Sequence, residues 1–433
     1  MRFYLFVLLN AVLFVRPADI FPELDGAPIY EAVILSCLAV SAPAIVQLLT
    51  PRKLYAQPLI LAMLGMLVAV IMSHLAHGRS GEAFEWGFRF FKIIAYFLLL
   101  VAVVDTPARL HHFVGWIAVL IVCMTGLSLL QYAGAIDLPS LAPIQQAEVD
   151  PETGETYQLP RLCGPGIFND PNDLSVILVV GLMIGLYQLK SAGAARVFWA
   201  GSLVLLGYAL TLTHSRGGFV ALVCAVMALA AGRLGLRKAI LFGGPAIIGL
   251  AVLFGGRQTN LDLSNSADTG QQRIRLWREG MVLLQQSPAF GIGAGRFEDE
   301  VGLVAHNSFV HSYAELGVLG GTLFLGAFVV PLAVLFRLRG TDRGRDRTLR
   351  DLRPFVLACV AGTAGGMVSL SRVYTLTPYL VLGMVTVVLG LTSPSAAHRL
   401  PRLSPRLIVL LLGLSVLFIA LTHVFVRLFA GTG

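Results

Sequence analysis

The sequence predicts an all-α fold: a polytopic transmembrane helical bundle of about 12–13 spans, with two longer outward loops that carry short helices. Only 13% of the residues are charged, whereas soluble domains carry roughly 25%. The mean hydropathy is +0.79, and many continuous apolar runs have the length of about 20 residues that spans hydrocarbon. These runs do not alternate between apolar and polar positions, which argues against a membrane β-barrel.

About thirteen apolar runs provide the predicted spans, and the pair around Ser215 is short enough to be broken or re-entrant. The first run resembles a signal peptide but lacks a small-x-small cleavage site, so a retained helix is expected. No internal repeat is visible, and residues 1–433 are therefore expected to form a single integral membrane domain. The predicted spans are 3–15, 29–49, 57–75, 88–105, 112–132, 172–189, 197–213, 217–232, 237–254, 308–336, 354–373, 376–392 and 406–428.

The loops between these runs alternate in charge. One set holds most of the 32 lysines and arginines, Arg2, Arg109 and Lys190 among them, with few acids such as Asp105 and Asp351. The positive-inside rule makes this set cytoplasmic. The net charge of +8 is therefore a signal of topology, and no nucleic acid partner is expected. The opposite set comprises 16–28, 76–87, 133–171, 214–216, 255–307 and a turn near Arg372.

The two long outward loops, 133–171 and 255–307, attract most functional interest because long loops are uncommon unless they are functional. The second loop contains an amphipathic helix with an apolar stripe at helical spacing, formed by Ile274, Trp277, Met281 and Leu284. Arg273, Arg275 and Arg278 lie on the same helix, and the pattern leaves open which of them faces a site. The segment 291–297 is predicted to be a turn, and the acids at 298–300 favour a solvated turn over a metal site.

Two arginines border outward segments. Arg216 lies in THSRGG between two apolar runs, where it either snorkels from a helix end or binds an anion. Arg161 opens the segment that ends in FNDPNDLS, and a salt bridge and a phosphate contact are equally open for it. The Asp170-Pro171 pair predicts a capped helix start, which also accounts for Asn172 and Asp173.

His306 and Asn307 stand where an apolar run begins. A histidine there could cap the helix, but arginines from separate outward loops favour an acid–base role beside a phosphate. Glu315, one turn beyond His311, is expected to pair with that histidine or with Arg216. The five cysteines form no CxxC pair, so neither a disulfide framework nor a zinc site is expected.

Several of these motifs together resemble the O-antigen ligase and polymerase family of bacterial inner-membrane proteins. The resemblance rests on THSRGG at 213–218, Arg273-x-x-x-Trp277, His306-Asn307 followed by Gly317-Val318-Leu319-Gly320, and the FNDPNDLS stretch. It implies transfer of an undecaprenyl-diphosphate-linked glycan on the periplasmic face, without a metal or other cofactor. In that scheme Arg216 and Arg273 hold the diphosphate, and His306 is the general base. Arg161, Arg275, Arg278 and Asn307 are the further substrate-binding candidates.

The acceptor distinguishes the two activities that the family comprises. A ligase transfers the whole glycan to lipid A-core or another acceptor, and we narrowly prefer it to a polymerase, which extends the glycan on its own carrier. A transporter for polyprenyl-linked glycans is the alternative from a different class. Transporters place ionisable residues near the middle of broken spans and carry repeats, and neither pattern is evident in the sequence.

Overall fold

The computed structural model describes residues 1–24, 26–149, 155–191, 193–253, 269–339, 347–392 and 401–429. The chain forms two compact units, each assembled from three stretches of sequence. The first unit comprises Met1–Ser41, Val103–Thr259 and Arg347–Thr363, and the second comprises Ala42–Ala102, Asn260–Asp346 and Ala364–Gly433. The expectation of a single membrane domain stays a prediction.

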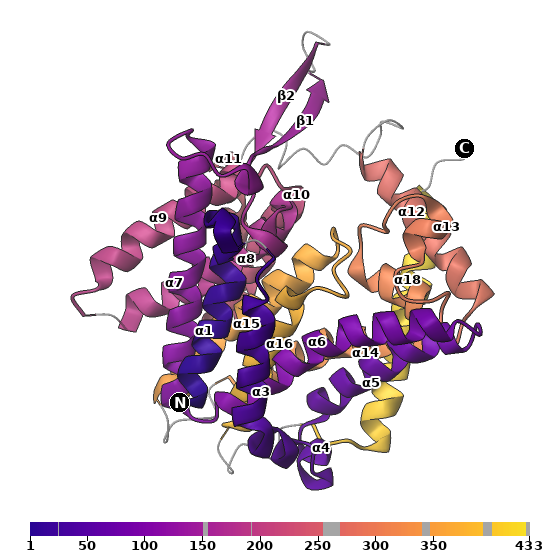
Figure 1. The fold of residues 1–433 in the computed structure, drawn as a ribbon. Coiled ribbons are helices and arrows are strands. Elements are labelled where there is room, and N and C mark those ends of the chain that lie inside the picture. Colours follow the sequence, from indigo (N-terminus) through magenta and orange to yellow (C-terminus); the bar gives the residue numbers. More distant parts are fainter. Residues whose placement is uncertain are drawn as a thin grey trace. The chain divides into compact units, whose positions relative to one another are not determined.

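The first unit is built around α8, which packs against α7, α9 and α10, while α1 packs along α7 (Figure 1). Phe6 of α1 is fully buried and stacks on Phe113 of α7 at a ring distance of 5.6 Å. The first apolar run is therefore an integral helix of this unit. Its helices are α1 (Arg2–Val15), α2 (Pro17–Ile20), α7 (Pro107–Tyr132), α8 (Pro171–Ser191), α9 (Arg196–Leu212), α10 (Arg216–Leu234) and α11 (Leu236–Leu253), with parts of α3 (Ile29–Leu48) and α15 (Arg347–Met367).

The second unit is built around α14, which packs against α5, α12, α16 and α18. Most of the side chains along α14 are buried, as a central helix requires. The helices of this unit are α4 (Pro51–Ala56), α5 (Pro58–Leu75), α6 (Ser80–Val103), α12 (Thr269–Gln286), α13 (Phe297–Val301), α14 (Ser308–Arg337), α16 (Leu376–Gly390) and α18 (Pro405–Phe429), with the remaining parts of α3 and α15.

Each predicted span falls on a helix, which confirms the all-α polytopic fold. In the described ranges, nine helices are long and apolar enough to cross a membrane, and α9 and α16 are shorter apolar helices. The predicted pair around Ser215 is two separate helices, α9 and α10, joined by residues 213–215.

The first outward loop differs from the expectation of short helices alone. It carries an antiparallel hairpin of β1 (Ile144–Val149) and β2 (Thr156–Arg161), in which Ile144 pairs with Arg161 (Figure 1). Short 3-10 helices, η2 (Pro139–Leu141) and η3 (Gly166–Phe168), flank the hairpin. A half-exposed strand pair needs only a few residues of mixed polarity, so hydropathy gave little sign of it.

Helix α14 is broken at Gly317, whose φ of 64° and ψ of −166° are not helical. The turn after α12 fills the break: the N–H groups of Ile292 and Gly293 donate to carbonyls of Ala314 and Glu315, both at 3.1 Å. Beyond the break, the N–H of Val318 donates to the Pro288 carbonyl at 2.8 Å. The backbone groups that the break frees are thus paired again inside the apolar unit, which is what a broken membrane helix needs.

Candidate functional site

His306 has an unusual backbone. Its φ is 49°, in the left-handed region that residues with a Cβ rarely occupy. The next residue, Asn307, is the N-cap of α14, and its Oδ1 accepts from the N–H groups of Phe309 at 3.0 Å and Val310 at 3.2 Å. Asn307, rather than His306, therefore caps the helix. Strained residues persist where the surrounding structure enforces them, and they are common at functional sites.

Trp277 fixes this segment against α12. Its indole Nε1 donates to the carbonyl of Ala305, immediately before His306, at 3.1 Å. Arg273 lies one turn before Trp277 on the same face of α12 and is half-buried, whereas Arg275 and Arg278 are exposed. Arg273 is therefore the arginine of this helix that lies on the His306 side, which the sequence left open.

The apolar stripe predicted for the second loop is confirmed. Met281 and Leu284 of α12 are buried in a cluster with Val310 and Tyr313 of α14, and Trp277 packs against the same cluster. Packing of this stripe places α12 beside the first turns of α14, because the apolar face of an amphipathic helix is the face that it buries.

Arg216 is the first residue of α10. Ser215 is the N-cap, and its hydroxyl accepts from the Gly218 N–H at 3.0 Å. His214, one residue earlier, has a left-handed φ of 47°. A Cβ on Gly218 would lie 2.5 Å from the Cβ of Ser175 in α8, so this glycine permits close contact between two helices.

Arg161 is almost fully buried, with 7% of its surface exposed. Its Nε donates to the Thr213 carbonyl at 2.9 Å, and its terminal nitrogens donate to Gln146 Oε1 at 2.9 Å and Asn172 Oδ1 at 3.0 Å. The three acceptors come from the segment before α10, from β1 and from the start of α8. Arg161 and the segment before Arg216 are thus joined within the first unit.

A buried carboxylate lies beside the break in α14. Glu315 is fully buried, and its oxygens accept from the N–H groups of Gly295 at 2.8 Å and Phe297 at 2.9 Å. The Tyr374 hydroxyl also donates to it, at 2.7 Å. His311 Nε2 lies 2.8 Å from Glu315 Oε1, an ion-pair distance without the alignment of a hydrogen bond. The predicted contact between Glu315 and His311 is thus present.

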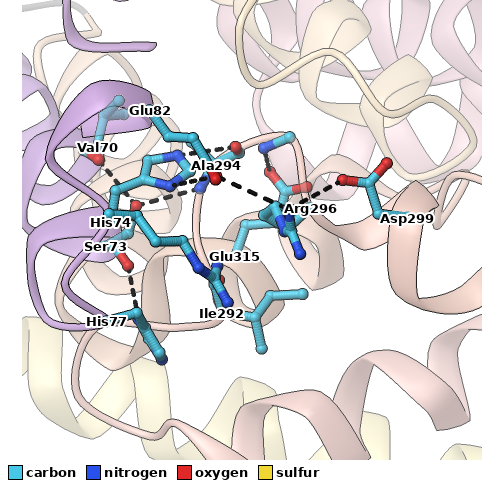
Figure 2. A network of polar contacts seen from close by, with 12 residues as sticks. Val70, Ser73, His74, His77, Glu82, Ile292, Ala294, Arg296, Asp299 and Glu315 are labelled. Carbon is cyan, nitrogen blue, oxygen red and sulfur yellow. Dashed lines mark hydrogen bonds and ion pairs between the residues drawn. The ribbon is translucent and has the colours of Figure 1, made fainter. Parts of the chain in front are cut away.

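Figure 2 shows how the 291–297 turn is held on its other side by α5 and α6. His74 Nε2 lies 3.0 Å from the Ala294 carbonyl, and its Nδ1 lies 3.2 Å from the Glu82 carboxylate. Arg296 lies 3.5 Å from Asp299 and 3.9 Å from Glu82. Two of the acids after the turn, Asp299 and Glu300, therefore pair with this arginine. Among the described residues, no group of three or more His, Cys, Asp or Glu side chains could hold a metal ion.

The predicted site residues fall into two groups. The first unit holds Arg161 and Arg216, and the second holds Arg273, His306, Asn307 and the exposed Arg275 and Arg278. Sequence reasoning missed the bond from Trp277 to Ala305 and the contacts of Asn172 and Ser215. Only two sequence signals indicated these contacts. One was the Arg-x-x-x-Trp spacing, and the other was the group of polar residues that the predicted helix cap at Asp170-Pro171 already explained.

The fold and these residues define a multi-pass helical membrane protein with cationic and imidazole groups at helix ends. The family model described as O-antigen ligase matches residues 201–325, which confirms the resemblance that the motifs indicated. The matched region includes Arg216, Arg273 and His306, but not Arg161. It supports glycan transfer of the O-antigen ligase and polymerase kind. The comparison with curated proteins gave no match.

Proposed function

We propose that this protein is a glycan ligase of the bacterial inner membrane. It would transfer a glycan from undecaprenyl diphosphate to an acceptor hydroxyl, such as one on lipid A-core, at the periplasmic face. One observation carries the proposal: the indole of Trp277 holds Ala305, and with it the strained His306, against the helix that bears Arg273. An imidazole and a guanidinium fixed in one unit suit acid–base chemistry beside a diphosphate.

His306 is the proposed general base. The proton of the acceptor hydroxyl moves to its imidazole while the acceptor oxygen bonds to the anomeric carbon of the glycan. The bond from that carbon to the diphosphate oxygen breaks, and undecaprenyl diphosphate leaves with the electron pair. Arg273 stabilises the negative charge that develops on the leaving group, as a fixed guanidinium does at little reorganisation cost.

Arg216 is the second proposed diphosphate ligand. A cation in the first turn of a helix is disfavoured by the helix dipole, which places partial positive charge at that end. Arg216 begins the 19-residue helix α10, so its charge adds to that of the helix end. This combination suits an anion, and an anion there would relieve the repulsion. Arg275, Arg278 and Asn307 remain predicted substrate contacts.

The test is transfer by the purified protein in liposomes, with an undecaprenyl-diphosphate-linked glycan as donor and a lipid A-core acceptor. The Arg216→Ala, Arg273→Ala and His306→Asn variants should each lower the rate by at least about 100-fold, the scale of a lost transition-state contact. Asparagine tolerates the left-handed backbone of His306, so that variant removes the imidazole with little added strain. Normal transfer by any of the three excludes that residue from the site.

Two further arms separate the alternatives. Transfer should persist in EDTA, and inhibition that magnesium reverses would reveal a metal requirement. Omission of lipid A-core should stop a ligase, whereas a polymerase would lengthen the glycan on its own carrier. Lengthened carrier-linked glycan would therefore replace the ligase proposal by the polymerase one, with the same donor chemistry.

A further inference from the structure

A chain of hydrogen bonds joins the FNDPNDLS and THSRGG motifs inside the first unit. We propose that Arg161, Asn172 and Ser215 are positioning residues, which act on the reaction by fixing the backbone from which Arg216 extends. This inference rests on the proposed function of Arg216. It gives Arg161 a different role from the salt bridge and the phosphate contact between which the sequence left the choice open.

The chain of hydrogen bonds begins at the guanidinium group of Arg161. The guanidinium holds the last residues before α10, since Nε donates to the Thr213 carbonyl at 2.9 Å. It also reaches α8, because a terminal nitrogen donates to Asn172 Oδ1 at 3.0 Å. A planar group with donors in fixed directions holds two acceptors in one geometry, whereas the ammonium group of lysine on its flexible stem does not fix their geometry.

The chain continues through one oxygen atom of Asn172. Its Oδ1 also accepts from the Ser215 hydroxyl at 2.8 Å. The orientation of this amide is fixed, because Asn172 Nδ2 donates to Asp170 Oδ1 at 2.9 Å and its backbone N–H donates to the same atom at 2.7 Å. The oxygen of Asn172 is thus turned toward Arg161 and Ser215.

These bonds hold the backbone on both sides of His214. The Thr213 carbonyl is held by Arg161, the Ser215 side chain by Asn172, and the Leu212 carbonyl accepts from the Leu162 N–H at 3.0 Å. His214 between them has its left-handed φ of 47°. Ser215 is 1% exposed, so water does not compete for these bonds. Arg216 directly follows Ser215, so the position of its Cα is fixed before a substrate binds.

Preorganisation of this kind affects turnover more than folding. A displacement of a reacting or stabilising group by about 1 Å can cost on the order of 100-fold in rate. Removal of the Asn172 amide leaves Arg161 and Ser215 without their shared acceptor, and the start of α10 can then shift. The expected result is a kcat about 30-fold lower, with a KM for the donor that changes less than about 3-fold.

The decisive experiment is a double-mutant cycle between positions 172 and 216. Transfer is measured for the wild type, Asn172→Ala, Arg216→Ala and the double variant, with all rates normalised to folded protein. If Asn172 acts through Arg216, then Asn172→Ala should lower kcat about 30-fold in the wild type but less than about 3-fold in the Arg216→Ala background. Ser128→Ala is the matched control, because it deletes a buried hydroxyl of the same unit that donates to the Met124 carbonyl in its own helix, and it should stay within about 2-fold of the wild type.

The outcomes separate the two proposals. If Arg216→Ala transfers as fast as the wild type, the proposed function of Arg216 fails. If Arg216→Ala is slow and Asn172→Ala lowers kcat equally in both backgrounds, only the positioning role fails. The same holds if the Asn172→Ala loss disappears once rates are normalised to folded protein.

A second pair of variants tests Arg161 directly. A phosphate contact depends mainly on charge, so Arg161→Lys would keep much of the activity that Arg161→Gln loses. A positioning role depends on the planar guanidinium group, which both variants lack. Arg161→Lys and Arg161→Gln should therefore lower kcat to a similar degree. Transfer by Arg161→Lys near the wild-type rate overturns the positioning role of Arg161.

Discussion

Glu315 shows how a single residue is kept charged inside an apolar unit. A buried carboxylate is tolerated when hydrogen-bond donors surround it. Two backbone N–H groups and the Tyr374 hydroxyl meet that need. Burial, followed by the nearby charge of Glu315, raises the pKa of Tyr374 well above its usual value. The tyrosine therefore remains a donor to the carboxylate.

The Tyr374→Phe variant tests this arrangement. Loss of a hydrogen bond to a charged group should cost about 1.5–3 kcal/mol. The folded state keeps the Tyr374 proton, while an unfolded tyrosine loses it near pH 10, so wild-type stability should fall as the pH rises above about 10. Melting temperatures between pH 8 and pH 11 should show a smaller fall for Tyr374→Phe. An equal fall in both proteins contradicts the assignment, and Tyr55→Phe, at an exposed tyrosine, is the control.

Trp277 gives a second prediction for a single residue. Trp277→Phe keeps an aromatic ring in the cluster but removes the N–H that holds Ala305. The His306 segment can then shift relative to α12, and kcat for transfer should fall about 10-fold. The half-exposed Trp116 of α7 serves as the control, and Trp116→Phe should change kcat by less than about 2-fold. Equal effects of the two variants would rule out this role for Trp277.

Local sequence signals predicted the roles of some single residues but not of others. The Asp170-Pro171 helix start follows from residue types at adjacent positions, as capping rules require. The partners of Arg161 and Trp277 are distant along the chain, and no local spacing specifies them. The choice among Arg273, Arg275 and Arg278 likewise needed the bond from Trp277 to Ala305, because the sequence does not show which face of α12 lies toward His306.

At the scale of elements, the broken helix α14 is the feature that organises the second unit. A Cβ on Gly317 would lie 2.5 Å from the carbonyl carbon and oxygen of Ala289, and its φ is positive. The run that contains Gly317 is mostly apolar, so hydropathy predicts a continuous helix there. Helix positions were predictable because burial in lipid requires long apolar runs. The break and the β1–β2 hairpin were not, since both depend on pairing with other segments.

Gly317→Ala should destabilise the protein by well over about 2 kcal/mol, because it adds both backbone strain and overlap with the docked turn. Gly413 of α18 is the matched control, since a Cβ there meets nothing within 4 Å. Gly413→Ala should be neutral or slightly stabilising, as alanine favours helix. Thermal unfolding in detergent measures both. Similar stability of the two variants would contradict the docking described for the turn.

At the scale of the whole molecule, the charge pattern agrees with the contacts inside each unit. Segments predicted to face outward contact each other: the Gly166 N–H donates to Asp19 at 3.0 Å, and Arg79 donates to the Ile292 carbonyl at 2.9 Å. Segments predicted to face inward do the same, and Lys190 lies 3.4 Å from Asp351. These contacts agree with the predicted alternation of the loops, and the side of the membrane that each set faces stays a prediction.

The direction of this arrangement in the membrane is a further prediction. Alkaline phosphatase fused after Gly270 should be active, because the enzyme folds only outside the cytoplasm, and the same fusion after Thr341 should be inactive. Immunoblots that show equal amounts of the two fusions are the control. The reverse pattern would place the predicted site at the cytoplasmic face and would overturn the proposed periplasmic reaction.

The most direct test of the central claim separates donor binding from transfer. The affinity for undecaprenyl-diphosphate-linked glycan is measured for the wild type, Arg216→Ala, Arg273→Ala and His306→Asn, beside their transfer rates. If arginines hold the diphosphate and the imidazole takes the acceptor proton, His306→Asn should bind the donor within about 3-fold of the wild type but fail to transfer it, and both arginine variants should bind it at least about 10-fold more weakly. Wild-type transfer by His306→Asn, or unchanged donor affinity in both arginine variants, would contradict the account.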